Sequence, residues 1–200
     1  MAARAGLDHT TVVQAAATLA DQQGLEAISL ATLAAQLGVR SPTLYHYVDG
    51  LAGLRRELAL LGTQELTHRL GHAVMGKAGD EAVLALAHTY RAFVKEHPGL
   101  YAATVQSADL ADSTLVAAQS ELVEIAMRTL TAYCLTGTEA VHVVRMLCSV
   151  VHGFATLEGS GGFGLSVDLD ESFRQLLQVF IAGLYQLPMT GSEESFAGGG

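Results

Sequence analysis

The chain has 200 residues, of which 50% are hydrophobic and 16% are charged, and its net charge is −9. This composition supplies a large apolar core and excludes an intrinsically disordered chain. The negative charge alone argues against a nucleic-acid partner, and two cysteines are too few for a disulfide framework. Polar residues interrupt every apolar stretch and no basic leader precedes one, so we expect a cytoplasmic protein with no membrane partner.

The predicted elements are helices, because apolar residues recur every three or four positions and nowhere alternate. The first helix is expected from about Asp8 to Gly24. The second follows Ser29 as its N-cap and ends before Gly38. A short third helix covers 41–47, and a long fourth helix begins at Asp49. Together these signals predict four helices in the first third of the chain.

The remainder of the chain continues as helices. Breaks are expected at residues 97–99, near 112 and at 136–137. The final two helices, about 139–158 and 169–187, are the most apolar. The fold class predicted from these patterns is all-α, with about nine helices.

Residues 29–54 contain two short helices joined by a tight turn at Gly38-Val39. This arrangement predicts a helix-turn-helix, whose second helix enters the major groove of DNA. Leu44 and Val48 are spaced to face inward, which turns hydroxyl, imidazole and guanidinium groups towards phosphates and base edges. The candidate DNA-binding residues are Arg40, Ser41, Pro42, Thr43, Tyr45, His46 and Tyr47.

Residues 6–70 resemble the N-terminal domain of TetR-type transcriptional regulators. The matching motifs are Gly38-Val39, Ser41-Pro42-Thr43, Leu44-Tyr45 and Tyr47-Val48. Leu51 stands where that family usually has a lysine that contacts a DNA phosphate. This departure predicts weaker anchoring to the DNA backbone, unless Arg55 and Arg56 compensate.

The charge is unevenly distributed along the chain. Residues 29–56 contain three basic residues and one acid, whereas residues 71–200 contain six basic residues and fourteen acids. The acidity therefore lies away from the predicted helix-turn-helix. A local excess of two positive charges predicts a shallow dependence of DNA binding on salt.

The C-terminal half resembles a subgroup of the same family. The run Val151-His152-Gly153 is similar to that subgroup's Trp-His-Gly hallmark, with valine in place of tryptophan. The resemblance implies an all-helical domain that binds a small molecule and forms a dimer. Apolar faces on the last two helices support a homodimer built as a four-helix bundle. The candidate interface residues are Val144, Leu147, Val151, Phe173, Leu177, Phe180 and Leu184.

Polar-tipped and aromatic side chains are candidates for lining an effector pocket. They are His68, Tyr90, Phe93, Tyr101, Tyr133 and Phe154. Because this half has few cations, an apolar or aromatic effector is favoured. No residue pattern indicates catalysis or a cofactor. His68 and His72 share one helical face and could hold a metal, but no third ligand has a suggestive spacing, so no metal site is predicted.

The sequence thus predicts a one-component regulator, most simply a repressor that binds a palindromic operator as a dimer and is released by a small molecule. The expected domains are a helix-turn-helix at 6–52, an effector-binding and dimerisation domain at 53–187, and a mobile tail at 188–200. Two alternatives stay open. One is a metal- or redox-sensing regulator that uses His68 and His72 or the cysteines. The other is a helical small-molecule-binding protein with a vestigial helix-turn-helix.

Overall fold

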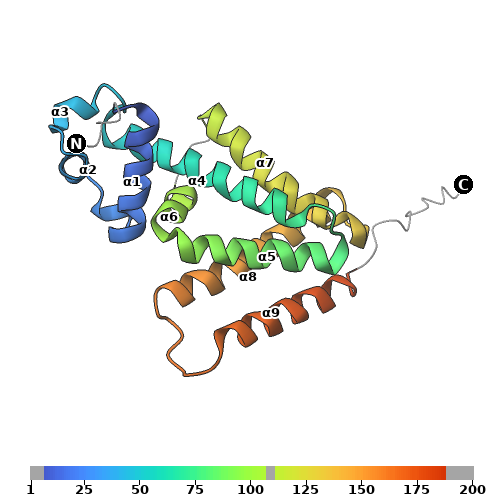
Figure 1. Ribbon diagram of the computed structural model, residues 1–200. Helices are drawn as coiled ribbons and strands as arrows, with labels where there is room; N and C mark the ends of the chain where they lie inside the picture. The colour runs from blue at the N-terminus through green and yellow to red at the C-terminus, as the bar shows by residue number, and fades with distance from the viewer. Residues whose placement is uncertain (1–6, 107–110, 188–200) are drawn as a thin grey trace, which may run out of the picture. The chain divides into compact units, whose positions relative to one another are not determined.

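The computed structural model describes residues 7–106 and 111–187, and the predicted tail at 188–200 lies outside them. Within these ranges the chain forms nine α-helices and two short 3-10 helices, η1 (Leu25–Ala27) and η2 (Thr131–Tyr133), and no strand (Figure 1). The all-α prediction is confirmed. The α-helices are α1 (His9–Gln23), α2 (Leu30–Leu37), α3 (Ser41–Leu44), α4 (Gly50–Val74), α5 (Gly79–Glu96), α6 (Pro98–Gln106), α7 (Ser113–Thr129), α8 (Gly137–Gly159) and α9 (Leu169–Leu184).

The first two helices begin and end at the residues that the sequence indicates. The Asp8 carboxylate accepts a hydrogen bond from the Thr11 amide at 2.7 Å and caps α1. Ser29 and Thr32 form a reciprocal capping box at the start of α2. Gly38 ends α2 in the left-handed region at φ +67°, where a Cβ atom would be strained.

Replacing Ser29 by Ala is expected to lower the free energy of unfolding by about 1 kcal/mol, because the α2 amides lose their cap. Urea denaturation followed by circular dichroism measures this change. Ser120→Ala is the matched control, since Ser120 lies exposed within α7 and its hydroxyl bonds only to the Val116 carbonyl of the same helix. Equal midpoints for the two variants would contradict a stabilising cap at Ser29.

Two compact units make up the described chain. One contains residues up to Arg69 together with 90–122, and the other contains residues 70–89 together with those from Val123 onward. Helices α4, α5 and α7 therefore each contribute to both units. Because these units are defined by compactness alone, the functional boundary predicted between residues 52 and 53 stays a prediction.

In the first unit, the end of α1 packs directly on the first turn of α6. Gly99 lies so close that a Cβ atom there would be 2.0 Å from the Ala20 carbonyl oxygen. The Asp21 carboxylate accepts hydrogen bonds from the amides of Gly99 at 3.0 Å and Leu100 at 2.9 Å. A residue of α1 thus satisfies amide groups at the start of α6 that no helical carbonyl can reach.

A charged network extends this contact to α4. His97 Nδ1 lies 2.8 Å from Asp21 Oδ2, and His97 Nε2 lies 3.0 Å from Arg69 Nη2. Because a guanidinium group only donates, Nε2 accepts and the ring proton is on Nδ1, facing Asp21. Arg69 also donates to Glu65 and Glu96, which together hold its pKa above the ordinary value. The network joins α1, α4 and the α5–α6 junction.

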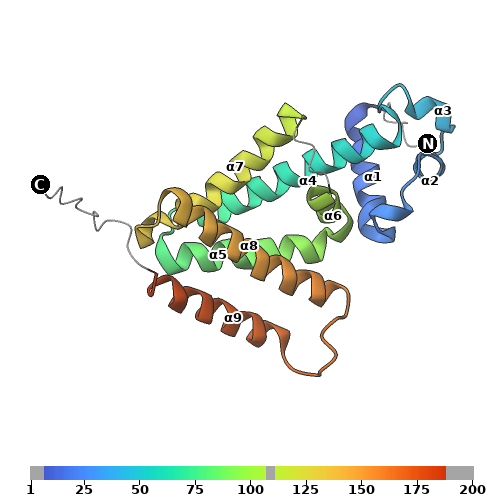
Figure 2. The ribbon, with the colours of Figure 1, turned by 180° about the vertical axis from the view of Figure 1, so that it is seen from behind.

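In the second unit, α8 and α9 lie side by side and are joined by the 160–168 connection (Figure 2). Phe173 is fully buried, with its ring 5.0 Å from that of Phe154 and 5.4 Å from that of His88. The packing of these rings fixes the start of α9 in the core of this unit.

By length and composition α8 could cross a membrane, since an 18-residue window within its 23 residues has a mean hydropathy of 1.5. The expectation that no stretch of this chain is so apolar is therefore wrong. Polar residues such as Arg145 do interrupt this helix. They are too widely spaced to lower the mean hydropathy of the 18-residue window below 1.5. Within this unit α8 buries Val143, Leu147 and Val151, and 33% of that 18-residue window is buried.

Candidate nucleic-acid interface

The candidate DNA-contacting residues lie on α3 and on the turn that follows it. Leu44 is fully buried and Val48 is 5% exposed, so the expected inward-facing pair is confirmed. Helix α3 ends at Leu44, three residues earlier than expected, because the amides of His46 and Tyr47 bond three residues back, to Thr43 and Leu44. Tyr45 and His46 therefore stand on a tight turn.

Exposure of the seven candidates differs along this segment. Arg40, Pro42, Tyr45 and His46 are exposed, with Tyr45 at 63%. The other three, Ser41, Thr43 and Tyr47, are half-buried. The structure therefore places a guanidinium, a phenol and an imidazole outside a buried leucine-valine base.

A polar hollow of about 370 Å³ lies beside these residues, between the start of α1, the α3 turn and the start of α4. We call it the reading-head hollow, because we refer to the α3 segment with its candidate DNA-contacting residues, 40–47, as the reading head. It is lined by His9, Tyr45, His46, Tyr47, Val48, Asp49, Gly53, Arg56 and Glu57. Both signs of charge meet in it, because an arginine and two carboxylates share its wall.

The two arginines expected to compensate for Leu51 have acidic partners within the chain. Arg55 donates to Glu26 at 3.0 Å, and Arg56 donates to both Asp112 and Glu57. Leu51 itself is 36% exposed at the start of α4. Arg55 and Arg56 are thus both held in ion pairs within the chain. Arg40 is the exposed arginine of the α3 segment.

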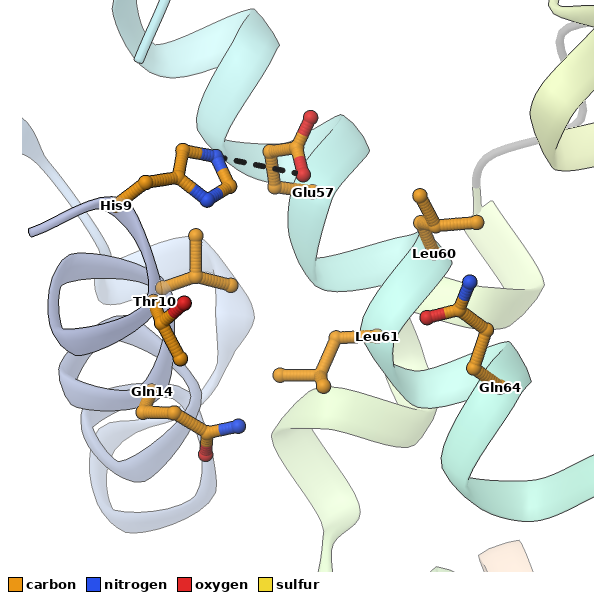
Figure 3. A pocket seen from close by; sticks show the side chains of 8 residues that line it. His9, Thr10, Gln14, Glu57, Leu60, Leu61 and Gln64 are labelled. Atoms are coloured by element: carbon orange, nitrogen blue, oxygen red, sulfur yellow. Dashed lines mark ion pairs between the residues drawn. The ribbon is translucent and has the colours of Figure 1, made fainter. Parts of the chain in front are cut away.

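A second cleft, of about 210 Å³, separates α1 from α4. Figure 3 shows His9 of α1 facing Glu57 of α4 across its mouth, with 3.6 Å between Nε2 and Oε2. Gln14 of α1 and Leu61 of α4 point into the space between the two helices, and Gln64 also lines the cleft. Polar side chains at this junction thus line a solvent-accessible gap.

Comparisons with known proteins identify the family. The family described as "Bacterial regulatory proteins, tetR family" matches residues 12–58, and "Tetracyclin repressor-like, C-terminal domain" matches residues 83–180. The uncharacterized HTH-type transcriptional regulator YobS of Bacillus subtilis is 35% identical over 184 residues, covering 92% of this chain and 96% of that protein. The chain belongs to the TetR family of transcriptional regulators.

Two further similarities agree with membership of the TetR family. The uncharacterized HTH-type transcriptional regulator Rv0681 of Mycobacterium tuberculosis is 31% identical, covering 96% of this chain and 88% of that protein. A solved structure of a protein of unknown function from Rhodococcus sp. RHA1 has a TM-score of 0.79 at 24% identity, covering 93% of this chain and all of the other. The structural likeness extends the shared fold over nearly the whole chain.

TetR-family proteins are DNA-binding regulators rather than enzymes, and they bind small-molecule effectors. The prediction of a TetR-type transcriptional regulator is confirmed. The matched N-terminal segment, 12–58, contains the whole of the α2–α3 pair and its buried base. The TetR reading head of this chain is therefore the segment built around α3.

Four of the six residues expected to line an effector pocket belong to the first unit. Tyr90 and Tyr101 meet in the first unit, with 2.7 Å between their hydroxyl oxygens. Phe93 is buried in the same unit, and its ring contacts the Arg69 guanidinium and the His97 ring. His68, also of that unit, lies on α4.

The other two belong to the second unit, where they make different contacts. Tyr133 donates to Asp80 at 2.5 Å, and the Phe154 ring packs on those of Phe163 and Phe173. Of these six residues, Tyr90 and Tyr101 are in direct contact. Their role in ligand binding stays a prediction.

Six of the seven residues expected at the dimer face are buried inside a single chain. They are Val144, Leu147, Val151, Phe173, Leu177 and Leu184, and the seventh, Phe180, is half-buried. A side chain buried within its own subunit has little area left for a partner, and the interface role of these residues stays a prediction. The apolar side chains that α8 and α9 leave exposed are Val141, Met146, Leu157 and Val179.

The metal- or redox-sensing alternative depends on clustered metal ligands or on reactive cysteines. Across 7–106 and 111–187, no group of three or more His, Cys, Asp or Glu side chains is placed to hold a metal ion. Cys134 is exposed, whereas Cys148 is half-buried. Burial raises the pKa of the Cys148 thiol, which lowers its thiolate fraction near neutral pH.

A carboxylate with two phenol donors is a feature that sequence reasoning missed. The Asp80 Oδ1 atom accepts hydrogen bonds from Tyr133 and, at 2.8 Å, from Tyr185 near the end of α9. These bonds lower the pKa of Asp80, while desolvation and the carboxylate raise that of Tyr133. The cluster ties the start of α5, η2 and the end of α9 together within the second unit.

Asp80→Asn is expected to lower the Tm by about 2–4 °C near neutral pH, a loss on the order of one net hydrogen bond. The lowered pKa of Asp80 means that its contribution exists above the ordinary value of 3.8 and disappears as pH falls through the folded-state pKa. The raised pKa of Tyr133 means that its contribution exists below 10.0 and disappears as pH rises further. Thermal melts of both proteins across pH should show a difference that is flat near neutrality and shrinks at both extremes. A difference independent of pH would contradict this account.

Proposed function

We propose that this TetR-family protein is a cytoplasmic, ligand-responsive repressor that binds a palindromic operator as a homodimer and leaves it when a small molecule binds. The observation that carries the DNA-binding part is the exposure of Arg40, Tyr45 and His46 over the buried pair Leu44 and Val48. Guanidinium, phenol and imidazole groups hydrogen-bond phosphates and base edges, and a rigid base gives such groups a fixed register on DNA.

Exposed apolar side chains on α8 and α9 support the homodimer. Val179 is 74% exposed and Met146 is 45% exposed, and burying such groups between two copies removes them from water. Two copies related by a twofold axis would present two reading heads to two half-sites about 34 Å apart or at a multiple of that distance. An operator with two inverted half-sites follows from this symmetry.

The paired phenols of Tyr90 and Tyr101 support an effector with an aromatic or apolar body. Their rings meet edge-to-face at 5.7 Å, and Tyr101 is 5% exposed. An effector that breaks the bond between their hydroxyls would replace it with its own polar group. Its binding energy would then act on α5 and α6, the helices that carry these two tyrosines.

Selection of duplexes from a random DNA pool tests this function. Purified full-length protein should enrich an inverted repeat, and the complex should contain two chains for each duplex by mass measurement. Enrichment of a single unrepeated site, or one chain for each duplex, would contradict the dimeric operator. Failure to enrich any sequence would contradict specific DNA binding itself.

A further inference from the structure

Arg56 lies at the edge of the reading head. It lines the reading-head hollow together with Tyr45, His46 and Tyr47, and its side chain is 41% exposed. A guanidinium in this place is within the same polar wall as the groups proposed to meet DNA. Few other cations beside α3 are available to DNA. Arg55 is paired with Glu26, and Arg40 is the exposed arginine of the segment.

The guanidinium of Arg56 is occupied by two carboxylates of its own chain. Its Nε and Nη2 atoms donate to the two oxygens of Asp112, the second at 3.0 Å, and Nη1 donates to Glu57 at 2.9 Å. Here two parallel N–H groups of one guanidinium donate to two oxygens of one carboxylate. Arginine binds a phosphate group with the same geometry. Asp112 therefore uses the donors that a DNA phosphate would need.

Asp112 is itself held firmly at the start of α7. Its Oδ1 atom accepts from the amides of Thr114 and Leu115, both at 3.1 Å, and its side chain is 12% exposed. The Arg56 guanidinium and these amides lower the pKa of Asp112. The partner of Arg56 is thus a fixed, ionised carboxylate rather than a mobile surface acid.

We propose that Asp112 is an autoinhibitory partner of Arg56, which holds back a guanidinium that would otherwise contact a DNA phosphate beside α3. The inference rests on the proposed DNA-binding function and adds a residue that limits its affinity. It makes DNA affinity depend on the first turn of α7, since moving that turn away would release one phosphate contact. While Asp112 holds Arg56, the protein therefore binds DNA more weakly than it would with the Arg56 guanidinium free to contact a phosphate.

The test compares full-length wild type with Asp112→Asn on a fluorescein-labelled duplex of fixed, unselected sequence over a range of salt concentrations. Asparagine keeps an oxygen for the α7 amides but removes the charge that binds Arg56. The expected result is about tenfold tighter binding at low salt and a log–log salt slope steeper by about 0.9 for each bound chain, hence by about 1.8 for the proposed homodimer, because each chain adds one phosphate contact. Asp112→Ser, which also keeps a capping oxygen, should give the same gain if the Asn variant does not fold.

A double variant separates this mechanism from a general change in charge. In Arg56→Gln/Asp112→Asn the gain should disappear, because no guanidinium is left to release. Glu171→Gln is the matched control, since Glu171 also pairs with an arginine, Arg174, but on α9 of the other unit, and its DNA affinity should stay within about twofold of wild type.

The outcomes distinguish this inference from the proposed function. An unchanged slope in folded Asp112→Asn, or a gain that persists in the double variant, would overturn the autoinhibitory role while leaving wild-type DNA binding intact. Binding by Asp112→Asn alone, with none by wild type, would support the role in its strongest form. Absence of binding by both folded proteins would overturn the inference, whereas the proposed function would be overturned only if selection from the random pool also enriched no sequence.

Discussion

Gly99→Ala is expected to destabilise the first compact unit by about 3 kcal/mol or more, at the upper end of the cost of forcing extra atoms into a packed site. A Cβ atom on residue 99 would lie 2.0 Å from the carbonyl oxygen of Ala20 and 2.7 Å from the Asp21 amide nitrogen. Backbone atoms cannot turn aside as a side chain can, so α6 must move away from α1. That movement also breaks the bonds from the α6 amides to Asp21.

Urea denaturation measures the effect of Gly99→Ala, and a second glycine gives the matched control. Gly153 lies within α8, and a Cβ atom there would meet nothing within 4 Å. Gly153→Ala should therefore leave stability unchanged or raise it by about 0.5–1 kcal/mol, because alanine favours a helix more than glycine does. A midpoint for Gly99→Ala that equals that of wild type would show that the α1–α6 contact is looser than described.

The second large effect is expected at the reading head. The triple variant Arg40→Ala/Tyr45→Ala/His46→Ala should weaken binding to a selected operator by about a hundredfold or more, since each base or phosphate contact is worth about 1–3 kcal/mol. All three side chains are exposed, so the free energy of unfolding should change little. Fluorescence anisotropy gives the affinity, and thermal melts report the fold.

Removal of a positive charge alone must be separated from loss of specific contacts. Arg128→Ala serves this purpose, because Arg128 is an exposed arginine of α7 paired with Glu124. Its operator affinity should stay close to that of wild type. Equal losses in the triple variant and in Arg128→Ala would mean that overall charge, rather than the α3 segment, determines DNA binding.

Local signals in the sequence predict much of this fold. Ser29 and Gly38 mark the ends of α2 because capping and left-handed glycine act within a few residues. The i, i+4 spacing of Leu44 and Val48 predicts their burial for a similar reason. Residues close together in the chain are therefore enough to locate the reading head.

Interactions between distant segments could not be predicted in this way. Arg56 meets Asp112 across 56 residues, and Tyr133 meets Asp80 across 53 residues. Periodicity also shows that Phe173 and Leu177 share an apolar face but not what covers it, and the covering proved to be the chain itself. Such pairings depend on how helices pack, which no local pattern encodes.

Photo-crosslinking from the reading head tests the central claim most directly. A photoreactive benzophenone amino acid replaces Tyr45 in one sample and Val179 of α9 in another, and each is irradiated on a selected operator. Both positions are exposed, at 63% and 74%, so accessibility does not separate them. The account predicts crosslinks from position 45 to bases within each half-site and none from position 179. Crosslinks from position 179 with none from position 45 would contradict the assignment of the α3 segment as the DNA-binding surface.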